Sequence, residues 1–125
     1  MSKSSAERVA AAKAEIESVD VETAKGLIGN NRYVFVDVRD SAELEAGKIP
    51  GSVHSHRGGL EFALDAASDF RNPELTGGRT LVMVCGSGGR AALATKLAIE
   101  FGHPAVCLEG GMKAWIGADG PLSGA

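Results

Sequence analysis

Two short apolar runs, each nearly continuous instead of alternating with polar residues, most strongly limit what this chain can fold into. They are YVFVDV at residues 33–38 and TLVMVC at residues 80–85. Strands that are apolar on both faces are typical of parallel sheets that lie between two layers of helices. Shorter apolar segments predict three further strands, at residues 16–19, 52–56 and 105–111.

Segments with helical patterns separate the predicted strands. Ser4 and Glu7 have the spacing of a capping box and predict an N-terminal helix over residues 1–14. After Gly88, apolar residues recur with the period of an α-helix that is predicted to end at Gly102. Further helical segments are predicted at residues 21–28, 41–46, 60–67 and 112–116.

The alternation of strands and helices predicts an α/β fold. We expect one domain over residues 1–125, with a central, mainly parallel sheet of four or five strands flanked by helices on both faces. The segment at residues 118–125 is rich in glycine and carries no periodic pattern, so it is predicted to be a loose tail.

The composition is that of an ordinary globular protein. The formal net charge of -3 does not suggest binding to nucleic acid. No apolar run approaches the length of a membrane span, and the N-terminus lacks the apolar centre of a secretion signal. We therefore expect a cytoplasmic protein without membrane contact, in which Cys85 and Cys107 are free thiols.

The segment CGSGGR, which begins at Cys85, follows the second apolar run and opens a predicted helix. Such a loop directs backbone N–H groups and the positive end of the helix dipole towards its first residue. These groups favour an anion, so they should stabilise the thiolate of Cys85 and make it a nucleophile. The glycines permit close backbone approach, and the arginine could hold an anionic substrate. The predicted anion-binding loop consists of Gly86, Ser87, Gly88, Gly89 and Arg90.

Other candidate residues also have structural interpretations. A cysteine that ends a buried strand is often only a small apolar residue, although the glycines and the arginine favour the reactive interpretation here. Asp37 and Arg39 end the first apolar run and could pair with each other, pair with Glu43, or cap a helix. Arg57 belongs to a small basic group that could line the pocket, and no metal site is predicted.

Three separated segments carry a further pattern. They are DVRDSAELEAGKIPGSVH at residues 37–54, VCGSGGR at residues 84–90 and LEGGMKAW at residues 108–115. In this order and spacing they resemble the rhodanese family, the sulfurtransferases whose cysteine carries sulfur as a persulfide. The resemblance covers residues 16–116.

The resemblance implies a persulfide on Cys85 and no metal or organic cofactor. It also implies a thiosulfate-like sulfur donor and an acceptor such as cyanide, a thiol or a protein sulfur carrier. Cys107 is expected to be a buried strand residue. Only a position close to Cys85 would let its thiol resolve a persulfide as a disulfide.

Two positions depart from the family pattern. Lys48 replaces the histidine of Gly-His-Ile-Pro-Gly at a position expected to be structural, and Gly86 leaves the pocket mouth wider and less charged.

The alternatives to a sulfurtransferase are a non-catalytic sulfur-binding, sensing or interaction module, and a cysteine phosphatase or arsenate reductase. Phosphatases of this general design place one more residue between cysteine and arginine, and they need an acid that this loop lacks.

Overall fold

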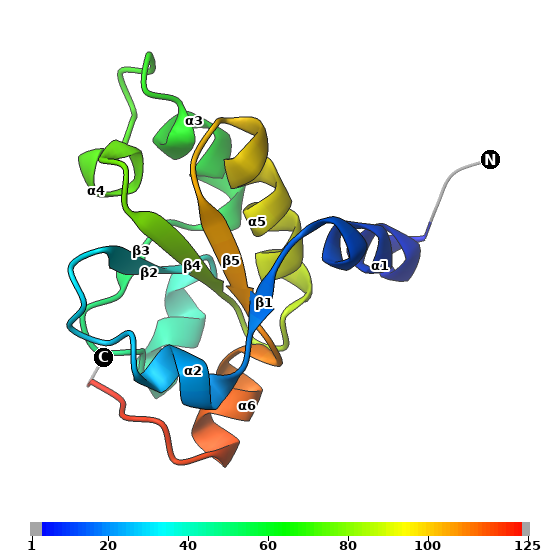
Figure 1. Cartoon of the computed structure of the whole chain (residues 1–125), viewed down its shortest axis with the longest axis vertical. Helices are drawn as coiled ribbons and strands as arrows, with labels where there is room; N and C mark the ends of the chain where they lie inside the picture. The colour runs from blue at the N-terminus through cyan, green and yellow to red at the C-terminus, as the bar shows by residue number, and fades with distance from the viewer. Residues whose placement is uncertain (1–3, 124–125) are drawn as a thin grey trace.

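The computed structural model describes residues 4–123, and residues 1–3 of the predicted first helix lie outside this range. It contains a five-stranded parallel sheet in the order β1-β5-β4-β2-β3 (Figure 1). The strands are β1 (Ser18–Val19), β2 (Tyr33–Asp37), β3 (Val53–His54), β4 (Thr80–Val84) and β5 (Ala105–Leu108). The predicted α/β class and parallel sheet are confirmed.

Helices connect the strands. The α-helices are α1 (Ser5–Glu15), α2 (Val21–Lys25), α3 (Leu60–Leu64), α4 (Pro73–Thr76), α5 (Gly89–Glu100) and α6 (Gly111–Gly117). Two 3₁₀-helices follow β2 and β3, namely η1 (Ser41–Ala46) and η2 (Arg57–Gly59). Within residues 4–123, no helix has both the length and the apolar character needed to cross a membrane.

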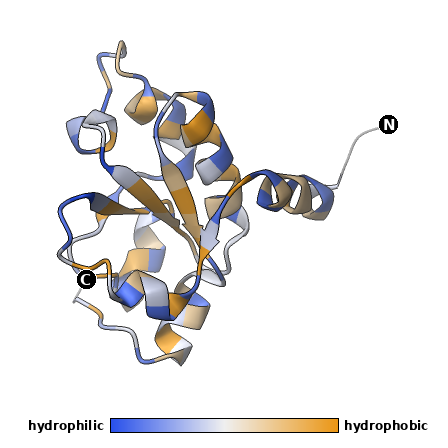
Figure 2. Ribbon diagram, viewed as in Figure 1, coloured by the Kyte–Doolittle hydropathy of each residue, from blue (hydrophilic) through white to orange (hydrophobic). Residues whose placement is uncertain are grey.

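The apolar side chains form two clusters, one on each face of the sheet. Alternate residues of β4 enter different clusters: Leu81 and Met83 pack with α5, whereas Val82 and Val84 pack with α6. Helices α1, α3, α4 and α5 contribute to the first cluster, and α2 and α6 contribute to the second. Figure 2 shows the resulting apolar strands between helices of mixed character. This double burial is why β2 and β4 have nearly continuous apolar sequences.

The carboxyl ends of β2 and β4 lie side by side. The two strands pair in register up to Asp37, which lies opposite Val84. Beyond the strands, the N–H of Val38 donates to the carbonyl oxygen of Val84 at 2.9 Å. The chain that leaves β2 is therefore next to the loop that begins at Cys85, at the sheet edge where α/β proteins bind ligands.

The second predicted helix is shorter than expected. Helix α2 ends at Lys25, and the N–H of Gly26 caps it by donating to the carbonyl of Thr23 at 3.1 Å. Glycine opposes a longer helix because it loses much conformational freedom there. The apolar spacing that continues to Ile28 therefore reflects burial in turns and does not extend the helix.

The predicted loose tail at residues 118–125 is held against the domain as far as Ser123. Ser123 and Lys48 exchange backbone hydrogen bonds of 2.8 and 3.3 Å. The indole N–H of the fully buried Trp115 donates to the carbonyl oxygen of Pro121 at 2.9 Å. A buried indole requires such an acceptor, and the tail supplies it. Lys48 therefore helps to hold the tail through its backbone. The last two residues of the predicted tail lie outside the described range.

Candidate active site

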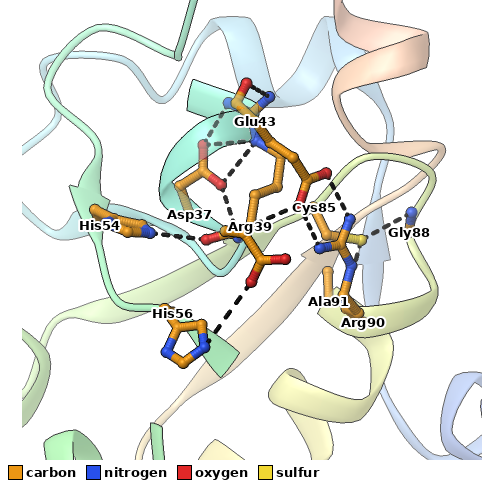
Figure 3. A network of polar contacts seen from close by, with 10 residues as sticks. Asp37, Arg39, Glu43, His54, His56, Cys85, Gly88, Arg90 and Ala91 are labelled. Carbon is orange, nitrogen blue, oxygen red and sulfur yellow. Dashed lines mark hydrogen bonds and ion pairs between the residues drawn. The ribbon is translucent and has the colours of Figure 1, made fainter. Parts of the chain in front are cut away.

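The sulfur of Cys85 lies in a cradle of backbone N–H groups between β4 and α5 (Figure 3). The N–H of Gly88 donates to Sγ at 3.0 Å, and the N–H of Ala91 donates to it at 3.3 Å. Gly88 precedes α5 with a φ of 107°, in the region that favours glycine. Because Gly88 offers no capping side chain, the Cys85 sulfur accepts the bond that a helix cap would normally take.

This geometry favours negative charge on the Cys85 sulfur. Both N–H groups lie at the start of α5, where the helix dipole adds partial positive charge. Hydrogen bonds to an ionised acceptor are stronger than those to a neutral one, so the two bonds stabilise a thiolate more than a thiol. Only 1% of Cys85 is exposed, so its sulfur depends on these N–H groups, and not on water, for its hydrogen bonds.

The start of α6 supports the same loop. The N–H of Met112 donates to the carbonyl oxygen of Cys85 at 2.8 Å, and the N–H of Lys113 donates to that of Gly86 at 2.9 Å. This approach requires glycine at position 111, because a Cβ there would lie 2.5 Å from the Cys85 oxygen and 2.7 Å from the Gly86 oxygen. The resemblance pointed to this segment, and close backbone packing is the physical reason for its glycine.

We predict that Gly111→Ala destabilises the protein by about 2–4 kcal/mol, from backbone strain, the clash and two weakened hydrogen bonds. Gly111 has a φ of 59°, so the added methyl group is disfavoured even before the clash is considered. Urea denaturation would measure the change. Gly102→Ala is the matched control: its φ is 88° and its methyl group would meet no described atom within 4 Å. Equal losses in the two variants would contradict the proposed support of the loop.

Arg90 forms a two-point ion pair with Glu43 of η1. Their N···O distances are 2.7 and 2.9 Å, and the N–H of Asp40 donates to the same carboxylate at 3.0 Å. Hydrogen bonding to Arg90, followed by that from Asp40, lowers the pKa of Glu43 to about 2. Hydrogen bonding to Glu43 in turn raises the pKa of Arg90, so the carboxylate and the guanidinium are both charged at neutral pH. Sequence reasoning missed this pair: the spacing of Asp40 and Glu43 indicates only a capping box.

Asp37 and Arg39 form a buried ion pair at the end of β2. The Asp37 carboxylate accepts from Nε of Arg39 at 3.0 Å and from Nη2 at 2.8 Å. The exposed fractions are only 1% and 4%, respectively. Arg39 also donates to the carbonyl oxygens of Glu43 at 3.2 Å and Gly47 at 3.0 Å. The pair therefore ties η1, which carries Glu43, to the sheet.

The structure places the remaining candidates at the same edge with different partners. The guanidinium of Arg57 binds Glu61 at 3.0 Å, so its role as a pocket residue stays a prediction. Nε2 of His54 lies 2.7 Å from the carbonyl oxygen of Arg39, which joins the chain after β2 to β3. Ser87 is exposed in the loop beside Cys85.

Cys107 lies in β5 and reaches the cysteine loop from within the core. Its Sγ is 3.9 Å from the carbonyl oxygen of Gly88, the residue whose N–H binds the Cys85 sulfur. Burial, with a smaller effect from Cys85, raises the pKa of Cys107 to about 11. Cys107 is therefore a buried strand residue whose thiol is protonated at neutral pH.

Two solved structures share the fold over nearly the whole chain. A structure from Rhodopseudomonas palustris CGA009, of unknown function and described as a possible tyrosine phosphatase, is 36% identical and superposes with a TM-score of 0.93, covering 98% of this chain and 96% of that one. The polysulfide-sulfur transferase homodimer of Wolinella succinogenes is 31% identical, with a TM-score of 0.76 and coverage of 94% and 85%.

Sequence comparison leads to the same family. The provisionally named sulfurtransferase YtwF of Bacillus subtilis (strain 168) is 30% identical over 108 residues, covering 86% of this chain and 97% of YtwF. The family described as Rhodanese-like domain matches residues 20–118, which include the cysteine loop, η1 and α6. The chain therefore belongs to the family of rhodanese-like domains, which includes sulfurtransferases.

Proposed function

We propose that this protein is a sulfurtransferase that carries sulfane sulfur as a persulfide on Cys85. The Cys85 thiolate attacks the outer sulfur of a donor, either thiosulfate or a persulfide. A new S–S bond forms while the S–S bond of the donor breaks, and the electron pair leaves with sulfite or a thiolate. Cyanide, a thiol or a protein sulfur carrier then removes the outer sulfur, which restores the Cys85 thiolate without net oxidation.

The observation that carries this proposal is the pair of N–H groups on the Cys85 sulfur. Their distances to Sγ are 3.0 Å from Gly88 and 3.3 Å from Ala91. A thiolate is the attacking group in the first step and the leaving group in the second, so its stabilisation serves both steps. The sulfurtransferases among the relatives support the same chemistry.

A cysteine phosphatase is the second candidate, because the Rhodopseudomonas palustris protein is described as a possible tyrosine phosphatase. Hydrolysis of a phosphate ester benefits from an acid that protonates the leaving oxygen. The carboxyl group of Glu43, which pairs with the loop arginine, has a pKa of about 2 and is ionised at neutral pH. Glu43 is therefore not suited to supply that proton, and the loop from Cys85 to Arg90 contains no acidic residue, so we expect negligible hydrolysis of aryl phosphates.

Intact-protein mass spectrometry tests the proposal directly. The protein is treated with thiosulfate or with glutathione persulfide, freed of reagent, weighed, and then treated with cyanide. We expect a mass gain of one sulfur atom, located on Cys85 by peptide mapping, which cyanide removes as thiocyanate. A parallel assay with p-nitrophenyl phosphate tests for phosphatase activity.

The outcomes separate three functions. Reversible sulfur loading with no phosphate release supports the sulfurtransferase. Phosphate release that depends on Cys85, without sulfur loading, would establish a phosphatase. If the protein shows neither activity, the proposal is wrong and a non-catalytic binding module becomes the better interpretation.

A further inference from the structure

Arg90 is the single cationic side chain of the loop that surrounds Cys85, and it already forms an ion pair. The intervening loop residues are glycine or serine, which leaves Arg90 as the loop's own partner for an anionic substrate. Both terminal nitrogens of Arg90 bind the carboxylate of Glu43, at 2.7 and 2.9 Å. The carboxylate is also held by the N–H of Asp40, so it is fixed from two sides.

The ion pair lies against the loop residue that directly follows the cysteine. A Cβ at Gly86 would lie 3.4 Å from Nη2 of Arg90 and 3.8 Å from Oε2 of Glu43. Figure 3 shows the two side chains meeting beside the Cys85 sulfur. Their side chains are 40% and 37% exposed, so a substrate that approaches the loop meets a carboxylate together with an already paired guanidinium.

The two classes of sulfur donor make different demands on this site. When Cys85 attacks thiosulfate, the leaving group is sulfite, whose negative charge is spread over three oxygen atoms that need cationic or N–H partners. When Cys85 attacks a persulfide, the leaving group is a thiolate, whose charge rests on one sulfur atom. The Glu43 carboxylate beside the loop repels the sulfite dianion. Arg90, which is already paired with Glu43, cannot give sulfite a full set of hydrogen bonds.

We infer that Glu43 is a positioning residue that sets donor specificity: by holding Arg90, it makes the site favour persulfide or polysulfide donors over thiosulfate. This inference rests on the proposed sulfurtransferase function and adds the class of donor to it. The sulfur still moves to Cys85 by thiolate displacement in both cases. The difference lies in the leaving group that the loop mouth can stabilise.

Steady-state kinetics of the Glu43→Gln variant test this role, with thiosulfate and glutathione persulfide as donors and cyanide as the acceptor. For the unmodified protein we expect kcat/KM to be at least about tenfold higher with the persulfide. In Glu43→Gln the ratio of thiosulfate to persulfide kcat/KM should rise at least about tenfold, chiefly through a lower KM for thiosulfate. Inhibition by added sulfite should become tighter for the same reason.

Three further variants separate electrostatics from a general disturbance. Adding Arg90→Gln to Glu43→Gln should cancel the gain, because the freed guanidinium is what binds the oxyanion. Gly86→Lys should raise the same ratio by an independent route, since Gly86 lies outside the left-handed region and an added Cβ meets only side-chain ends. Glu15→Gln is the matched control: it removes the carboxylate of the exposed pair with Lys96, whose N···O distance is 2.9 Å, and should leave the ratio unchanged.

The inference is wrong if the unmodified protein uses both donors equally well, or if a folded Glu43→Gln variant leaves the ratio unchanged. Gly86→Lys decides the question if circular dichroism shows that Glu43→Gln does not fold. In these cases the intact mass still shows sulfur on Cys85, so the proposed function survives. If neither donor adds sulfur to Cys85, the proposed function fails and the donor preference fails with it.

Discussion

Cys85→Ser is expected to lower sulfur transfer by more than about 10³-fold, the scale of loss on removing a nucleophile. A serine hydroxyl is not expected to form a stable persulfide analogue or to act as a thiolate-like leaving group. It can still accept the N–H bonds of Gly88 and Ala91 at the start of α5, so the fold should persist. Thiocyanate formation and intact mass measure the first effect, and circular dichroism checks the second.

Cys107→Ser is the matched control for this experiment. It also exchanges a buried sulfur for oxygen, but in β5, where Sγ contacts the Gly88 carbonyl at 3.9 Å. We expect most activity to remain, with a modest loss of stability from burying a hydroxyl. If Cys107→Ser loads one sulfur on Cys85 but cannot turn over, Cys107 is a resolving thiol and its assignment as a strand residue is incomplete. Full activity in Cys85→Ser would refute the mechanism itself.

Asp37→Asn is expected to lower the free energy of unfolding by about 3–5 kcal/mol, the usual result of removing one partner of a buried ion pair. The charged Arg39 guanidinium would remain buried, with only 4% exposed, and would lack its counter-ion. Asparagine keeps nearly the same shape, so the loss reports charge more than packing. Urea denaturation measures the loss in free energy of unfolding. A loss of this size is a large share of the stability of a small domain.

Glu61→Gln provides the comparison with an exposed ion pair. It removes the carboxylate that binds Arg57 at 3.0 Å, where the two side chains are 32% and 48% exposed. Such pairs contribute about 0–1 kcal/mol, so the expected loss is several times smaller. Similar losses in both variants would show that burial does not amplify the Asp37–Arg39 interaction.

The β4–Cys85–α5 unit could be predicted from sequence because its signals are local. An apolar run, a group of glycines and a helical period follow one another within about 20 residues, and each has a direct structural meaning. These features depend on near neighbours in the chain, so no knowledge of tertiary structure is required.

The partner of Arg90 could not be predicted in the same way. Glu43 stands 47 positions earlier, and only the register that places Asp37 opposite Val84 brings η1 to the cysteine loop. Many acidic residues would satisfy a pairing rule based on charge alone. The contacts of the tail were missed for a related reason, because backbone hydrogen bonds such as those of Ser123 leave no periodic pattern in the sequence.

The contacts of the two chain ends also bear on where the folding unit stops. The family match spans residues 20–118, whereas Ala12 of α1 is buried in the cluster that contains α5, and the Trp115 indole finds its acceptor at Pro121. The segment that the family match covers is thus smaller than the part of the chain that completes the core. A fragment cut at the family boundaries would keep every reactive group, yet it would expose apolar surface beside α5 and leave a buried N–H without its acceptor.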